Sequence, residues 1–185
     1  MEFLNREYTA QSVAMATGAT PKQITDWCNQ GLIVGQREPL GRGHKRTFSW
    51  FNVMEIAGAL ALMEIGVKAP GDAFRASTLF SHIGQGATSW VDDDALTDDK
   101  SERIPALPYH HNHGETYLVV ANGEGRIILS VDGRINTGVI NRHRAPVTGF
   151  IALNMSNVFA RVVMRMAFDP REVLDDAYLQ DATAR

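Results

Sequence analysis

Apolar and polar positions in the first 70 residues form short helical patterns separated by turn residues. Thr9 is placed to cap a first helix that ends at Thr17-Gly18, because its side-chain oxygen can accept a hydrogen bond from an unpaired amide. Thr20-Pro21 starts a second helix, since proline at the first helical position costs no hydrogen bond. Gly31 closes this helix after about ten residues.

Ser49 is placed to cap a third helix, which continues to Gly66. Its apolar residues fall at helical spacing and predict one buried stripe: Val53, Ile56, Ala57, Leu60 and Met63.

The segment between the second and third helices, residues 34–48, combines turn residues with positive charge. Three glycines and Pro39 predict a turn between short extended arms. Four cations stand against Glu38: Arg37, Arg42, Lys45 and Arg46. A basic tip of this kind can lie along a phosphate backbone, where each neutralised phosphate releases counterions. Helix, turn, helix, basic hairpin, helix is the order of a winged helix-turn-helix, so the sequence predicts DNA binding.

The residues that carry this order resemble the MerR-type DNA-binding domain. They are Tyr8-Thr9, Val13-Ala14, Thr17-Gly18, Ile24, Trp27, Gly31-Leu32-Ile33, Arg46-Thr47-Phe48-Ser49, Asn52-Val53 and Leu60 to Gly66. The resemblance implies a winged helix-turn-helix over residues 1–68. Thr25 stands where many relatives have an arginine, and Pro70-Gly71 interrupts the position of the family's long dimerisation helix.

The second helix and the basic segment supply the predicted DNA contacts. The candidate residues are Thr20, Lys22, Gln23, Asp26, Asn29, Arg37, Arg42, His44, Lys45 and Arg46. Gln can pair with adenine through two hydrogen bonds, and Lys can bind guanine or phosphate. Trp27 is assigned to the core, against Val13 and Leu32, rather than to base contact.

Residues 69–102 predict a connection between two parts of the chain. Pro70 to Ile83 reads as a helix with Ala73, Ala76, Phe80 and Ile83 on one face, which we expect to pack against the DNA-binding domain. Six acids against one lysine in residues 92–102 predict a solvated linker.

Residues 103–185 predict a small antiparallel sheet with helices. Glu115 to Ala121 and Arg126 to Val131 are β-rich runs joined by a turn at residues 122–125, and Asp132-Gly133 leads to a third run at residues 134–140. Gly149 to Met155 supplies a fourth strand. The remaining elements are a segment that suits a helix capped by Ser156-Asn157 or a strand, and a helix from Asp169-Pro170 carrying Val173, Leu174, Ala177 and Tyr178. The fold class is therefore α+β.

Residues 109–115 contain three histidines that raise the alternative of a metal site. On one strand face, His111, His113 and Glu115 would alternate correctly for metal binding. This pattern is similar to the first half of a cupin motif, but the second half is missing. The histidines are also too close together in the sequence for a His-Asn-His nuclease motif. With neither motif complete, the sequence predicts no cofactor.

Composition and net charge exclude further classes of protein. The net charge of -3 argues against a protein that coats nucleic acid indiscriminately, and the single cysteine, Cys28, excludes an internal disulfide. Two interpretations of Cys28 stay open: it is a redox sensor, or it is a thiol without a functional role. No apolar run approaches the ~20 residues needed to span a bilayer, so we expect a cytoplasmic protein without membrane contact.

These patterns predict a non-enzymatic transcriptional regulator that binds double-stranded DNA as a homodimer. The C-terminal part carries more apolar residues than a small sheet can cover, which favours a second copy: Leu118, Val120, Ile127, Leu129, Ile151, Leu153, Val158, Phe159, Val162, Val163 and Met166. Two alternatives stay open. One is a prophage excisionase or recombination factor, and the other is a regulator gated by a metal or ligand through a degenerate cupin-like module.

Overall fold

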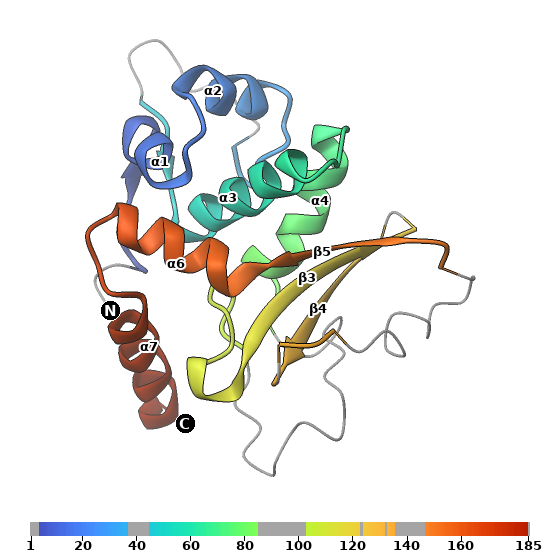
Figure 1. The fold of residues 1–185 in the computed structure, drawn as a ribbon. Coiled ribbons are helices and arrows are strands. Elements are labelled where there is room, and N and C mark those ends of the chain that lie inside the picture. The colour runs from blue at the N-terminus through green and yellow to red at the C-terminus, as the bar shows by residue number, and fades with distance from the viewer. Residues whose placement is uncertain are drawn as a thin grey trace.

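The computed structural model describes residues 4–36, 45–84, 103–122, 124–131, 133–135 and 147–184 as a mixed α+β fold. Helices α1 to α4 form a helical head, and a three-stranded sheet lies below it with α6 crossing between the two (Figure 1). The head elements are β1 (Tyr8–Thr9), α1 (Ala10–Thr17), α2 (Pro21–Asn29), β2 (Thr47–Phe48), α3 (Trp50–Glu64) and α4 (Pro70–Ser81). The remaining elements are η1 (His111–His113), β3 (Glu115–Ala121), β4 (Glu124–Ser130), β5 (Phe150–Asn154), α6 (Met155–Arg165) and α7 (Pro170–Ala184).

The helix boundaries predicted for the head are confirmed by their caps. Thr9 Oγ1 accepts a hydrogen bond from Ser12 N at 3.2 Å, and Gly18 ends α1 with a φ of 88°. Thr20 and Ser49 each begin a helix with a capping box, in which the cap side chain and the third helical residue bond each other's backbone amides. Local hydrogen bonds therefore determine the residue at which each of the helices α1, α2 and α3 begins.

The buried stripe predicted on α3 is confirmed in part, because Val53, Ile56 and Ala57 are buried while Leu60 and Met63 are half-buried. The helix is also covered on nearly all its other sides. Its buried residues are Trp50, Asn52, Val53, Met54, Glu55, Ile56, Ala57, Gly58, Ala59, Ala61 and Leu62. Helices α1, α4 and α6 all pack against it. A Cβ on Gly58 would lie 2.3 Å from Ser77 Oγ of α4, so glycine lets these two helices approach closely. Helix α3 is the central helix of the molecule.

The helix predicted at Pro70 is confirmed as α4, although it ends at Ser81 and leaves Ile83 outside. Ala73, Ala76 and Phe80 are buried as expected. Helix α4 packs on α3 and also on β4, where a Cβ on Gly125 would lie 2.6 Å from Leu79 Cδ1. Helix α4 is therefore the part of the head that contacts strand β4 of the sheet. Within the described residues, no helix has the length and apolar character required to cross a bilayer.

The sheet is antiparallel with strand order β4-β3-β5. The predicted hairpin is confirmed, with β3 and β4 paired from Glu115↔Ser130 to Ala121↔Glu124. Strand β4 starts at Glu124, two residues earlier than predicted, and Asn122 turns the chain with a φ of 49°. Strand β5 pairs with the other edge of β3. The strand predicted at residues 134–140 lies mostly outside the described residues, as does the linker at residues 92–102.

The segment after β5 is a helix, which settles the choice between helix and strand. Its cap is Asn154 rather than Ser156-Asn157, because Asn154 Oδ1 accepts from Asn157 N at 3.0 Å. Ser156 instead accepts a hydrogen bond from Thr116 N of β3 through its hydroxyl oxygen at 2.9 Å. The last helix begins at Pro170 as predicted, with Asp169 Oδ1 accepting from Arg171 N at 2.7 Å.

One buried cluster runs from the head into the C-terminal part of the chain, from Tyr8 to Ala177. It contains Leu118, Ile127, Leu129, Leu153, Val158, Phe159, Val162 and Val163. The argument that these residues need a second copy for cover is therefore wrong, because helices of the same chain cover them. A smaller cluster of Val119, Ala121 and Ile128 lies apart from the main one.

A buried arginine joins the end of α4 to the chain that enters the sheet. Arg103 is 2% exposed, and its Nη1 donates to Phe80 O at 2.9 Å and to Leu107 O at 3.1 Å. Its guanidinium also lies 4.9 Å from the centre of the Phe80 ring. Burial lowers the pKa of Arg103. This arginine satisfies carbonyls at the C-terminus of α4 and fixes the segment that leads to η1.

Candidate nucleic-acid interface

The turn between α1 and α2 contains only Gly18, Ala19 and Thr20, and side chains hold it closed. Thr17 Oγ1 donates to Val13 O at 2.8 Å and accepts from Ala19 N at 3.2 Å. Arg165 of α6 lies against the turn, since a Cβ on Gly18 would be 2.9 Å from its Nη1. The angle between the two helices is therefore fixed by local bonds and by a residue far along the sequence.

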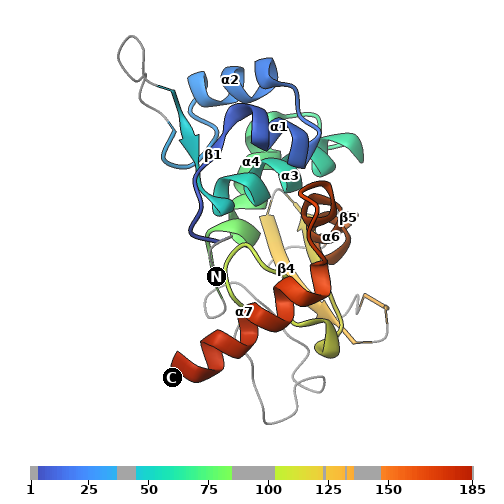
Figure 2. The ribbon, with the colours of Figure 1, turned by 90° about the vertical axis from the view of Figure 1, so that its left-hand side faces the viewer.

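Helix α2 is anchored through one apolar face and exposes the other. Ile24, Trp27 and Cys28 are buried, so the assignment of Trp27 to the core is confirmed. The Trp27 ring packs edge-on against Phe74 of α4, with ring centres 5.2 Å apart. Figure 2 shows α2 at the outer end of the head, away from the sheet. One side of α2 is thus available to a partner.

The candidate residues Lys22 and Asp26 lie on this outer side and bind each other. Lys22 Nζ lies 2.8 Å from Asp26 Oδ2, with 85% and 45% of the two side chains exposed. The hydrogen bond that Lys22 donates to Asp26, and the negative charge of Asp26, raise the pKa of Lys22. Asp26 therefore offsets part of the positive charge that Lys22 presents to a phosphate.

Thr20 and Gln23 are also exposed, but both take part in capping α2. Gln23 Oε1 accepts from Thr20 N at 2.8 Å and from Thr20 Oγ1 at 3.0 Å. Paired recognition of adenine requires both the oxygen and the nitrogen of the amide to face the base. Capping of the helix and adenine recognition therefore compete for the Gln23 side chain.

The base of the basic segment is closed beside α2. Gln36 Nε2 donates to Thr47 O at 2.8 Å. This hydrogen bond joins the start of the basic segment to its end. Strand β2 then pairs with β1, through Tyr8↔Phe48, a pairing that the sequence patterns did not predict. Both Nη atoms of Arg46 lie 3.2 Å from Asn29 Oδ1 at the end of α2.

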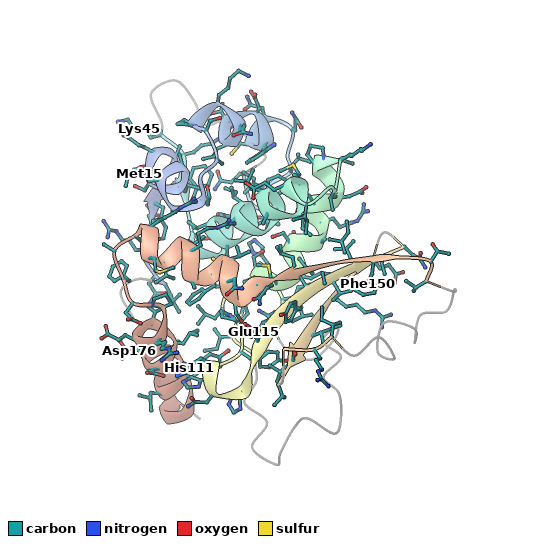
Figure 3. All side chains as sticks on the ribbon, viewed as in Figure 1. Met15, Lys45, His111, Glu115, Phe150 and Asp176 are labelled. Carbon is teal, nitrogen blue, oxygen red and sulfur yellow. The ribbon has the colours of Figure 1, made fainter. Side chains whose placement is uncertain are left out.

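This bond brings two predicted DNA contacts, Asn29 and Arg46, into one unit. Lys45 is exposed next to them at the edge of the head (Figure 3). Three further candidates, Arg37, Arg42 and His44, lie outside the described residues.

A buried carboxylate in α3 fixes the segment that follows α2. Glu55 is fully buried, and its two carboxylate oxygens accept from Val34 N at 3.2 and 3.3 Å. Asn52 Nδ2 donates to Val34 O at 3.0 Å, and His82 Nε2 lies 3.1 Å from Glu55 Oε2. Sequence reasoning missed this network. Its only sequence signal was a single acid within the apolar pattern of α3.

Cys28 is a buried thiol on the inner face of α2. Burial raises the pKa of Cys28, and the nearby Arg46 charge lowers it by a smaller amount. A thiol with a raised pKa is a weak nucleophile at neutral pH, which favours a structural role over redox sensing.

The histidine segment does not have the geometry that a strand would give it. His111 and His113 belong to η1, a 3-10 turn that precedes β3, so they do not alternate with Glu115 on one strand face. Glu115 Oε2 instead accepts from Tyr117 Oη at 2.8 Å. The structure brings together a different set, His110, His111 and Asp175. Sequence reasoning missed Asp175, which is 65 residues away from His110 and carries no local signal.

The sequence was compared with known proteins once this geometry was established. No protein-family model matches the chain, and a search of curated proteins finds no significant match.

Proposed function

We propose that this protein is a sequence-specific DNA-binding regulator with a MerR-like winged helix-turn-helix head. The observation that carries the proposal is the arrangement of α1, a three-residue turn and α2, with the base of a basic segment tied to the end of α2. Helix α2 would enter the major groove, and the basic segment would lie along the backbone.

The division of roles follows from the chemistry of each group. Lys45 and Arg46 are cations on one edge of the head and would bind phosphate. Gln23 and Asn29 carry amides that can contact base edges. Because Arg46 holds Asn29, backbone binding and base recognition would be mechanically coupled.

A homodimer is part of the proposal. One head makes few contacts, and two-fold symmetric sites are the usual way to gain affinity and specificity. Exposed apolar side chains outside the head include Phe150, Met164, Phe168 and Leu179. Sedimentation of the full-length chain at micromolar concentration measures the association state directly, and a dimer is expected.

The central experiment uses the full-length protein, because the head shares its core with α6 and the sheet. Duplexes selected from a random pool should converge on one sequence, and affinity for that sequence should then be measured against salt concentration. Lys45→Ala should make the slope of log affinity against log salt shallower by about 0.9, the contribution of one phosphate contact.

Arg171→Ala is the matched control, because Arg171 is an exposed cation on α7. Its slope should equal that of the unmodified protein. Failure to select any common sequence, or equal slopes for Lys45→Ala and the unmodified protein, would contradict the proposal.

Base recognition by Gln23 is separated from capping by comparing two substitutions. Gln23→Glu keeps an oxygen that can accept from Thr20 N but loses the amide donor that adenine recognition needs. It should weaken binding to the selected duplex by about 1–3 kcal/mol and leave the helix stable. Gln23→Ala should also lose about 1 kcal/mol of stability through the cap. Equal losses on selected and scrambled duplexes would exclude base recognition by Gln23.

A further inference from the structure

Three side chains converge where η1 meets α7, at the opposite end of the molecule from α2. His110 Nε2 lies 2.8 Å from Asp175 Oδ1, and His111 Nδ1 lies 3.6 Å from the same oxygen. The two imidazole rings are stacked with centres 4.3 Å apart. Figure 3 shows His111 between α7 and the turn that precedes β3. Two ring nitrogens are therefore directed at one carboxylate.

We infer that His110, His111 and Asp175 form a binding site for a divalent transition-metal ion such as Zn²⁺. Each side chain offers one ligand atom, and the three atoms lie within 4.8 Å of one another. Ligand atoms around a tetrahedral zinc ion, at about 2.0–2.1 Å from the metal, lie about 3.4 Å apart. Small rotations of the partly exposed His111 and Asp175 side chains would close this difference.

The donor set selects the class of metal. Two imidazole nitrogens and one carboxylate oxygen suit zinc and its neighbours, whereas calcium and magnesium prefer oxygen ligands alone. Three protein ligands leave a fourth tetrahedral position for water. The site therefore takes a late transition metal with one exchangeable ligand.

The surroundings leave the site accessible to an ion. The side chains of His110, His111 and Asp175 are 15%, 31% and 49% exposed. Tyr178 packs edge-on against the His110 ring, with centres 5.6 Å apart, and its hydroxyl donates to Pro108 O at 2.7 Å. The His110 ring is thus held in position from α7, while His111 and Asp175 are the more exposed members of the set.

Metal binding also makes a specific demand on His110. Asn112 N donates to His110 Nδ1 at 3.3 Å, which leaves Nε2 to carry the proton that Asp175 accepts. An ion bound at Nε2 displaces that proton to Nδ1, and the hydrogen bond from Asn112 N is lost. The amide of Asn112 is therefore a local reporter of metal binding.

The consequence for the fold is a metal-dependent link between α7 and the body of the molecule. His110 and His111 belong to the segment that enters β3, whereas Asp175 belongs to α7. Because the α2 surface takes no part in this site, the inference is independent of the proposed DNA-binding function.

The test is a calorimetric titration of the full-length, chelator-treated protein with zinc chloride. We expect one ion per chain. His111→Ala and Asp175→Asn should each weaken zinc binding by about tenfold or more, since each removes a ligand. Zinc should raise the thermal unfolding midpoint of the unmodified protein but not that of His111→Ala. The Asn112 amide resonance should shift in step with zinc binding.

His113→Phe and Glu115→Gln are the matched controls, because both residues lie in the same segment outside the three-residue set. Phenylalanine keeps the edge-on packing of residue 113 on the His110 ring, whose centre lies 6.0 Å away, and removes the ring nitrogens. Both variants should bind zinc within about twofold of the unmodified protein, a change far below the loss of a ligand. Three outcomes would overturn the inference: no saturable binding, unchanged affinity in Asp175→Asn, or a loss in His113→Phe as large as that in His111→Ala.

Discussion

Two histidine–carboxylate groups of this chain have nearly the same contact distance but very different surroundings. In the head, His82 Nε2 lies 3.1 Å from Glu55 Oε2. At η1, His110 Nε2 lies 2.8 Å from Asp175 Oδ1. The Glu55 side chain is 0% exposed, whereas 49% of the Asp175 side chain is exposed.

The difference lies in how many donors each carboxylate already has. Besides His82, Glu55 accepts hydrogen bonds from Val34 N, Asn52 Nδ2 and Thr78 Oγ1. A buried carboxylate with this many donors is a fixed part of the fold, because any loss leaves buried polar groups without partners. Asp175 is hydrogen-bonded by His110 at an accessible surface, so an ion can replace that bond. A histidine–carboxylate pair therefore serves structure in one place and suits ligand binding in the other.

The largest effect is expected from Glu55→Ala. It should lower the free energy of unfolding by about 3–5 kcal/mol, because removing one member of a buried pair leaves the other partners unsatisfied. Urea unfolding followed by circular dichroism measures the loss. Glu64→Ala, at the exposed end of α3, is the control and should change stability by less than about 0.5 kcal/mol. Equal losses in the two variants would remove the distinction between the two sites.

A smaller loss is expected from His82→Phe. Phenylalanine preserves the stacking with Phe51, whose ring centre lies 5.9 Å from that of His82, but it cannot donate to Glu55. The free energy of unfolding should fall by about 1–2 kcal/mol, the cost of one lost hydrogen bond to a buried charge. Zinc titration of the same variant should be unchanged. A reduced zinc affinity would show that the head, rather than η1, holds the metal.

The smallest effect on stability is expected from Asp175→Asn in chelator-treated protein. Exposed ion pairs contribute about 0–1 kcal/mol, so urea unfolding should hardly distinguish this variant from the unmodified protein. Added zinc should then separate the two, because the unmodified protein binds the ion more tightly and gains more stability from it. A loss of 3 kcal/mol or more without zinc, about the size expected of a buried pair, would place Asp175 in the same class as Glu55.

Most helices and the strands β3, β4 and β5 could be predicted because their signals are local, whereas η1, β1 and the pairing of β1 with β2 were not predicted. Thr9, Thr20 and Ser49 cap helices through bonds that span three residues, and the β3–β4 turn is set by Asn122. Such signals fix where an element begins but not what covers it. The cover of α3 comes from α4 and α6, which is why a stripe of five residues underestimated its burial.

The candidate sites, too, contain features that local signals predict and features that depend on the folded chain. The exposed side of α2 follows from its helical pattern, whereas the competition for Gln23 depends on the geometry of the cap. The convergence of Asp175 with His110 joins two distant segments through the path of the whole chain. No spacing rule links residues so far apart in sequence, and the histidine pattern alone favoured Glu115 instead.

The contact between Arg165 and the α1–α2 turn bears on the order in which the protein is made. Arg165 Nη1 lies 3.5 Å from Ala16 O across 149 residues of sequence, and α6 packs against both α1 and α3. On the ribosome, the first two helices leave the exit tunnel long before α6 is synthesised. The head therefore cannot complete its packing until most of the chain has been synthesised. A stalled nascent chain would expose an α1–α2 surface that lacks its contact with α6. Translation itself thus delays the moment at which this surface is complete.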